Sequence, residues 1–99
     1  MLGVENGAVI VEEVTGTTPT ITGIPNYRYK CGEVSTISIT PPTSGSIDVR
    51  FNSGSTAAVM TVPSTVKWPE WFDAENLDTN TTYEILITDG VYGSVMTWA

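Results

Sequence analysis

Hydrophobic and polar residues alternate along most of this chain, in short runs that are separated by turn-forming residues. In Ser46–Phe51 the apolar side chains stand at every second position, which is typical of a strand with one buried face. Comparable runs, rich in Val, Ile, Thr and Tyr, occur at Ala8–Val14, Thr20–Thr22, Tyr27–Cys31, Val34–Thr40, Thr56–Val62, Thr82–Ile87 and Val91–Trp98. The pattern predicts an all-β protein.

Two of the connections between these runs have the character of hairpin loops. Asn52–Ser55 is a four-residue polar loop between Ser46–Phe51 and Thr56–Val62, and a loop of this length commonly joins antiparallel strands. Asp89 and Gly90 form a strong tight-turn signal between the last two runs. The short spacing of runs and turns therefore favours a single antiparallel β-sandwich of the Greek-key or jelly-roll type.

Tyr83 lies where a polar segment that starts at Leu77 enters a strand. In Greek-key sandwiches a Tyr at such a corner can direct its hydroxyl back to the backbone a few residues upstream. We therefore interpret Leu77 and Tyr83 as a structural corner, with a fibronectin III-like sandwich as one form of the fold. The chain is expected to be one domain over residues 1–99, in which residues 1–25 form an N-terminal arm or strand.

Length, charge and cysteine content narrow the class of protein. Ninety-nine residues provide one modest core. Eleven acidic and four basic residues give a net charge of −7, which disfavours nucleic acid and anionic membrane surfaces as partners. Cys31 is the only cysteine, so no intrachain disulfide can form. We also expect neither a signal peptide nor a membrane span, and hence a protein made in the cytoplasm.

The sequence offers little for catalysis. It contains no His, so it cannot build a Ser-His-Asp or Cys-His site. Glu70 and Asp73 flank aromatic residues in the manner of glycosidase acids, but a domain of this size rarely builds the cleft that such a reaction needs. The acidic segment that begins at Asp73 fails as an EF-hand loop, because Asp78 stands where Gly is required. We expect no enzyme activity, no cofactor and no metal.

Trp68, Trp71 and Phe72 form the densest aromatic group in the chain. Exposed rings of this kind bind sugars or anchor protein interfaces, but a Trp in a loop also commonly caps an open end of a core. Burial against the core or a subunit is favoured over a ligand platform. On the last strand, alternation places Tyr92 on one face together with Met96 and Trp98, which suits a subunit interface.

Six runs of the chain carry a resemblance to known proteins: Tyr29–Thr36, Ile39–Pro42, Ser53–Thr56, Pro63–Asp73, Asn80–Ile85 and Gly90–Trp98. With these runs the chain resembles, over roughly residues 8–99, small proteins and C-terminal domains encoded in phages and prophages of gut Firmicutes. The resemblance implies a structural or tail-associated virion protein, and it assigns no functional residue.

The leading hypothesis is a non-enzymatic virion accessory protein of the fibre, tail-tip or capsid-decoration type. Such a protein would be located in the virion, form a homotrimer, contact other virion proteins and take part in attachment to the host surface. In this hypothesis the segment Ala8–Val14 docks or exchanges between chains, and the loop Trp68–Phe72 lies at an interface or tip.

Two alternatives stay open. One is a carbohydrate-binding module that stacks host glycans on Trp68, Trp71 and Tyr92, with Asp73 and Asn76 as partners of the sugar hydroxyls. The other is a fibronectin III-like spacer domain without a ligand. Whether Trp68 is buried or exposed separates the two leading hypotheses.

Overall fold

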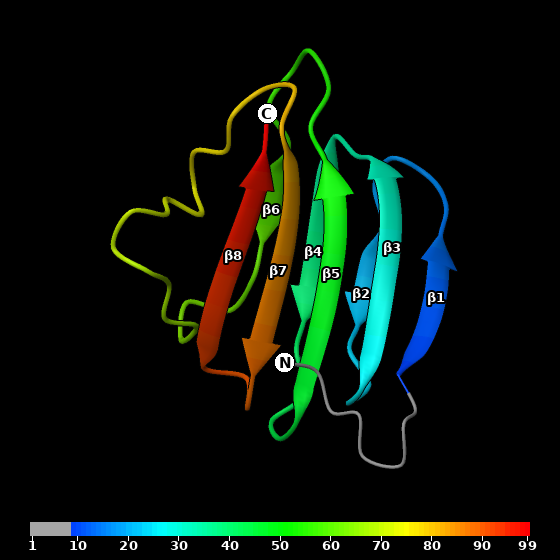
Figure 1. Cartoon of the computed structure of the whole chain (residues 1–99), viewed down its shortest axis with the longest axis vertical. Helices are drawn as coiled ribbons and strands as arrows, with labels where there is room; N and C mark the ends of the chain where they lie inside the picture. The colour runs from blue at the N-terminus through cyan, green and yellow to red at the C-terminus, as the bar shows by residue number, and fades with distance from the viewer. Residues whose placement is uncertain (1–8) are drawn as a thin grey trace.

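The computed structural model describes residues 9–99, and these residues form two β-sheets (Figure 1). The predicted all-β character is confirmed, because the described residues form strands and turns without a helix. The strands are β1 (Ile10–Val14), β2 (Thr20–Thr22), β3 (Tyr27–Glu33), β4 (Thr36–Thr40), β5 (Ser46–Asn52), β6 (Val59–Thr61), β7 (Thr82–Thr88) and β8 (Tyr92–Trp98).

The first six strands alternate between the two sheets. Sheet A has the order β1-β3-β5-β7-β8 and sheet B the order β2-β4-β6, and Figure 1 shows sheet B behind sheet A. Because each strand is followed by one in the opposite sheet, strands two apart become neighbours and run parallel: β1 with β3, β3 with β5, β2 with β4 and β4 with β6. The predicted single antiparallel sandwich is therefore not confirmed, and its antiparallel pairing is wrong for these four pairs.

The predicted hairpin through Asn52–Ser55 is also wrong. β5 belongs to sheet A and β6 to sheet B, where β6 pairs with β4. The connection begins at Ser53, which is buried: its backbone N–H donates to the carbonyl of Thr81 at 2.9 Å, and its hydroxyl accepts the N–H of Ala58 at 3.0 Å. These bonds hold the chain in a crossing between the sheets, whereas a hairpin would keep both strands in one sheet.

The C-terminal hairpin is present as the turn chemistry predicts. β7 and β8 pair antiparallel, with Thr88 opposite Tyr92. Asp89 and Gly90 have φ values of 56° and 68°, and the N–H of Val91 donates to the carbonyl of Thr88 at 3.1 Å. Positive φ at both central residues is the geometry of a type I′ turn, which matches the twist of the two strands.

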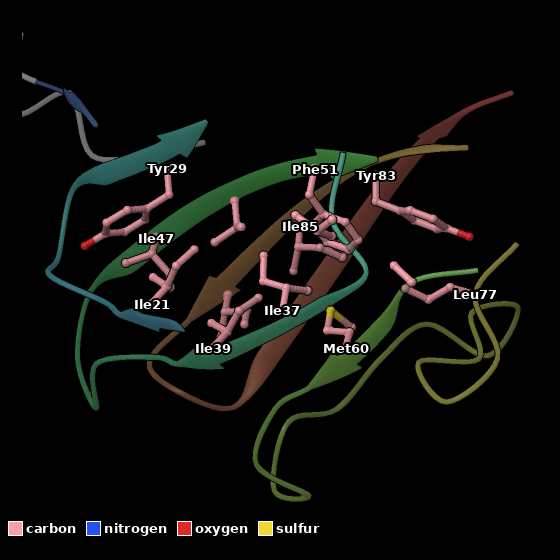
Figure 2. Packing of buried hydrophobic residues seen from close by; sticks show 14 of the residues in the cluster. Ile21, Tyr29, Ile37, Ile39, Ile47, Phe51, Met60, Leu77, Tyr83 and Ile85 are labelled. Carbon is pink, nitrogen blue, oxygen red and sulfur yellow. The ribbon is translucent and has the colours of Figure 1, made fainter. Parts of the chain in front are cut away.

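The core lies between the sheets. Its most deeply buried side chains come from the central strands of sheet A and from β4 of sheet B: Ile37, Ile39, Ile47, Val49, Phe51, Ile85 and Ile87. Figure 2 shows Ile37, Ile39, Ile47, Phe51 and Ile85 packed together. Ile47, Val49 and Phe51 are fully buried, as the period-two pattern of that strand predicts. The free Cys31 packs beside this core, and burial raises the pKa of its thiol to about 11.

Two tyrosines close opposite ends of the core (Figure 2). The Tyr83 hydroxyl accepts the backbone N–H of Asp78, five residues upstream, at 2.7 Å. The Tyr29 hydroxyl accepts the N–H of Ile24, also five residues upstream, at 2.9 Å. Each ring packs inside while its hydroxyl satisfies a backbone donor at the rim, which is how a buried Tyr avoids an unpaired polar atom.

The segment expected to form an N-terminal arm contributes to both sheets where it is described. β1 pairs with β3 of the same chain, with Ile10 opposite Tyr27 and Val14 opposite Cys31. β2 pairs with β4, and its Ile21 is buried in the core. Ala8, the first residue of the predicted first strand, lies with residues 1–7 outside the described part of the chain.

Candidate functional site

The aromatic residues singled out from the sequence lie in the long connection between β6 and β7. This connection is fastened to the edge of β8 by a parallel bridge between Lys67 and Tyr92. The N–H of Lys67 donates to the carbonyl of Val91 at 2.6 Å, and the N–H of Gly93 donates to the carbonyl of Lys67 at 2.9 Å. The loop is therefore held beside sheet A, and the start of β8 gains a hydrogen-bonded neighbour on its edge.

Trp68 is half-buried and packs against the core. Its indole lies directly over Gly93, where a Cβ atom would come within 2.5 Å of two ring carbons. Only a residue without a side chain allows this approach. One face of Trp68 is thus occupied by the backbone of β8, which makes Trp68 mainly a cover of the core.

Phe72 joins the exposed and buried aromatic rings into one cluster. It contacts Trp68 and Trp71 edge-to-face, with ring centroids 5.2 Å and 5.7 Å apart. It also contacts Tyr83 at 6.1 Å, and Tyr83 stacks on Phe51 in the core at 5.5 Å. At the outer end, Trp71 remains 63% exposed. Trp71 is therefore a large exposed ring whose position is supported by rings that reach into the core.

A groove of about 670 Å³ separates the aromatic loop from β6. Its lining combines apolar and acidic side chains, including Met60, Val66, Trp68, Glu70, Phe72 and Asp73. Three of the residues predicted as a site, Trp68, Phe72 and Asp73, thus share one groove. Trp71 instead lines a neighbouring depression of about 230 Å³, which also includes Phe72, Asp73 and Asn76.

The Asp73 carboxylate is engaged in its own turn. It accepts the N–H of Glu75 at 3.0 Å and the side-chain amide of Asn76 at 2.8 Å. These bonds, the one from Asn76 first, lower the pKa of Asp73, and a lowered pKa is the opposite of what a glycosidase general acid needs. No group of three potential metal-ligating side chains occurs in residues 9–99. The local geometry is that of a turn closed by Asp73.

Tyr92 lies apart from the groove. It is 62% exposed at the start of β8, on the outer face of sheet A, and it lines neither of the two hollows beside the loop. Met96 and Trp98 share this face, at 56% and 45% exposure, as the alternation along the strand predicts. The structure therefore separates Tyr92 from the Trp68–Phe72 loop and joins it to a second exposed apolar surface.

The same outer face carries a cluster of charges that the sequence did not reveal. Arg28 of β3 stands opposite Asp48 of β5, and Arg50 of β5 stands opposite Glu84 of β7. Arg50 Nη2 lies 2.8 Å from Glu84 Oε1, and the Arg50 guanidinium lies 5.6 Å from the centre of the Trp98 ring. Asp48 and Glu84 are both buried, at 6% and 9% exposure.

Asp48 and Glu84 shift each other's pKa values in opposite directions. Burial first, and then a hydrogen bond and charge repulsion from Glu84, raise the pKa of Asp48 to about 7. The hydrogen bond from Asp48 is the main cause that lowers the pKa of Glu84, and Arg50 adds to it. Two adjacent carboxyl groups cannot both ionise freely in a buried site, so the raised pKa of Asp48 keeps its carboxyl protonated to higher pH than that of Glu84.

Sequence reasoning had one partial signal for this cluster. Asp48 and Arg50 alternate with the buried Ile47, Val49 and Phe51, and this alternation places both on the outer face of the strand. The alternation does not say which strands lie beside β5. The cluster forms only because β3 pairs in parallel with one edge of β5 and β7 pairs with the other edge.

Comparisons of this chain with family models, curated proteins and solved structures gave no significant match. Among the described residues there is no helix long and apolar enough to cross a membrane.

Proposed function

We propose that this protein is a non-enzymatic virion accessory protein of the fibre, tail-tip or decoration type that assembles as a homotrimer through the Trp71 loop. The observation that carries the proposal is the exposed Trp71 ring, held edge-to-face on Phe72 at the end of an aromatic cluster rooted in the core. The virion context comes from the sequence resemblance, and the interface from this geometry.

A supported Trp has the properties of an interface anchor. Its ring gives a large apolar contact, and because Phe72 already restricts its position, little conformational entropy is lost on binding. The groove and depression beside it offer concave surface next to the anchor. Burial of Trp71 against a second copy would remove the most exposed large apolar side chain of the described residues from water.

The charge of the chain favours an apolar contact of this kind. Each copy carries a net charge of −7, so three copies repel one another and long-range electrostatics cannot drive their association. An aromatic contact overcomes this repulsion over a short range, and added salt weakens the repulsion. The trimer is therefore expected to tighten as the salt concentration rises.

The other two hypotheses find less support in the geometry. A sugar platform built from Trp68 and Trp71 would need both rings to be open to solvent, but Trp68 is half-buried against the core and lies over Gly93. A fibronectin III-like spacer would need antiparallel sheets, whereas four strand pairs here are parallel.

Light scattering tests the proposal at two protein concentrations tenfold apart. The native chain is expected at three times its monomer mass of 10.6 kDa, and Trp71→Ala is expected to shift toward monomer. Val59→Ser is the matched control, because Val59 is equally exposed at 61% but lies on β6, and it should remain trimeric. A native chain that is monomeric at both concentrations would refute the proposal.

A further inference from the structure

A pocket of about 310 Å³ opens on the outer face of sheet A, away from the aromatic loop. Its walls include the apolar side chains of Leu86 and Met96 and the backbone region around Ser94. Arg28, Asp48 and Glu84 also line it. An apolar wall with a few convergent polar groups is the usual composition of a small-molecule site.

Two polar atoms in this pocket are buried without a hydrogen-bond partner among the described residues. They are Arg28 Nε, a donor, and Asp48 Oδ1, an acceptor, and Asp48 is only 6% exposed. Buried polar atoms in folded proteins are nearly always paired, so unpaired ones indicate a missing partner. A carboxyl group keeps acceptor capacity in both of its protonation states, so Asp48 can accept a further hydrogen bond.

The missing partner must both donate and accept. Arg28 and Asp48 stand directly opposite each other on neighbouring strands, so the unpaired donor and the unpaired acceptor belong to side chains that lie side by side in the wall of the pocket. A hydroxyl group, or two hydroxyls on adjacent carbons, satisfies both atoms at once. A purely cationic or purely anionic group satisfies only one of them.

The charges on and around this face favour a neutral ligand over an ion. Arg28 and Arg50 disfavour a cation, whereas Glu84 and the net charge of −7 of the chain disfavour an anion. Arg50 is already paired with Glu84, so the Arg28 charge is left unpaired in the pocket when Asp48 is protonated.

We infer that the outer face of sheet A binds a neutral carbohydrate, with the hydroxyls of one pyranose ring on Arg28 and Asp48. Tyr92 and Trp98, on the same face of β8, provide exposed rings for stacking against sugar C–H faces. They are six positions apart, which on a strand corresponds to roughly 20 Å. The face is therefore long enough for an oligosaccharide.

This inference deepens the proposed function as a virion accessory protein, and it rests on that function only for the source of the sugar. The binding chemistry belongs to sheet A of a single chain, whereas the trimer is proposed to form through the Trp71 loop. A monomer that binds sugar would refute the trimer and leave this inference standing.

The test is an NMR titration of the full ¹⁵N-labelled chain with methyl glycosides of glucose, galactose and N-acetylglucosamine, and with an oligosaccharide of each. We expect saturable shifts in the amides of Leu86, Ser94 and Met96 and in the Trp98 indole, with dissociation constants on the order of millimolar for single sugars. Oligosaccharides should bind more tightly than the matching single sugars.

Three variants locate the binding. Ser94→Leu fills the mouth of the pocket from an exposed position and should weaken binding about tenfold or more without touching the buried charges. Arg28→Lys keeps the charge but removes Nε–H, and should weaken binding by a similar factor. Trp71→Ala should bind as the native chain does.

Several results would overturn the inference. One is a flat titration with every member of this sugar panel. Another is a set of shifts confined to residues 68–73, which would place the sugar on the aromatic loop. A third is signal loss on the outer face that follows protein concentration and not sugar concentration, because a second copy would then cover the pocket.

Discussion

The two exposed aromatic surfaces of this protein rest on different supports. Trp71 stands on Phe72 and, through it, on Tyr83 and the core, so its neighbours are other rings. Trp98 lies under the Arg50 guanidinium, which is paired with the buried Glu84. A Trp side chain is thus supported by aromatic rings in the loop and by an ion pair on the sheet.

Because their supports differ, the two surfaces are suited to different partners. A ring on an apolar support offers contact area without hydrogen-bonding groups, which suits a protein interface. A ring beside convergent donors and acceptors suits a ligand that has both C–H faces and hydroxyls. Four changes test the support of the loop and the support of the sheet independently.

Removal of the ring that links the loop to the core should have the largest effect. Phe72→Ala deletes the contacts with Trp68, Trp71 and Tyr83, and because Phe72 is only partly buried we expect a loss of about 2–3 kcal/mol in the free energy of unfolding. In the dissociated monomer, where assembly does not contribute to stability, Trp71→Ala should change the free energy of unfolding by less than about 0.5 kcal/mol, since Trp71 is exposed there. Urea denaturation measures the free energy of unfolding of both variants. Equal losses would show that Trp71 contributes to the fold as much as Phe72 does, which contradicts the described support.

The outer face should make stability depend on pH. The raised pKa of Asp48 means that the folded state holds a proton which the unfolded state releases near pH 4, so this contribution to stability is present at low pH and is lost as pH rises toward 7. Between pH 5 and pH 7 we expect a loss of about 2 kcal/mol. The lowered pKa of Glu84 acts below this window, because its shift lies under the usual value of 4.5.

Asp48→Asn is the control for this pH dependence. It removes the titrating group while keeping the size of the side chain, so the free energy of unfolding should become nearly flat from pH 5 to pH 7. Thermal denaturation across the pH series gives the comparison. A native chain that gains stability over this range would contradict the raised pKa of Asp48.

The contact between Trp68 and β8 can be tested at its glycine. Gly93→Ala places a Cβ within 2.5 Å of the indole and should cost about 1–2 kcal/mol as Trp68 shifts. Gly32→Ala is the matched control, because no atom lies within 4 Å of the added Cβ there. Tryptophan fluorescence should change for the first variant alone, and a change in both would indicate a general effect of added side chains in strands.

The smallest effect should come from the hydroxyl that holds the corner beside the loop. Tyr83→Phe keeps the ring that supports Phe72 but removes the acceptor of the Asp78 N–H, which should cost about 1 kcal/mol. The mass of the assembly should not change, because the support of Trp71 depends on rings. Denaturation and light scattering on the same sample provide both values, and a loss of the trimer would show that the hydroxyl also positions the loop.

The positions of the strands and their buried faces could be read from the sequence. Alternation identified Ile47, Val49 and Phe51 as an inner face, and Asp89-Gly90 identified the last hairpin. Alternation specifies which face of a strand is buried but not which sheet the strand joins. The polar loop after Asn52 therefore resembled a hairpin, although the buried Ser53 directs the chain into the other sheet.

Because the sequence does not specify which strands pair, it predicted one candidate site and missed the other. Trp68, Phe72 and Asp73 lie close in sequence, so their shared groove followed from one loop. The pocket on sheet A combines residues from β3, β5, β7 and β8, and its Arg28–Asp48 pair exists only because β3 and β5 are parallel neighbours. No local pattern contains that pairing.

The most direct test of this division is the solution mass of the Trp71→Ala and Trp98→Ala variants, measured side by side with the native chain by light scattering. The account predicts that Trp98→Ala keeps the mass of three chains and that Trp71→Ala falls toward one. A Trp98→Ala variant that falls apart while Trp71→Ala stays assembled would contradict it, because the sheet face would then be the interface between copies.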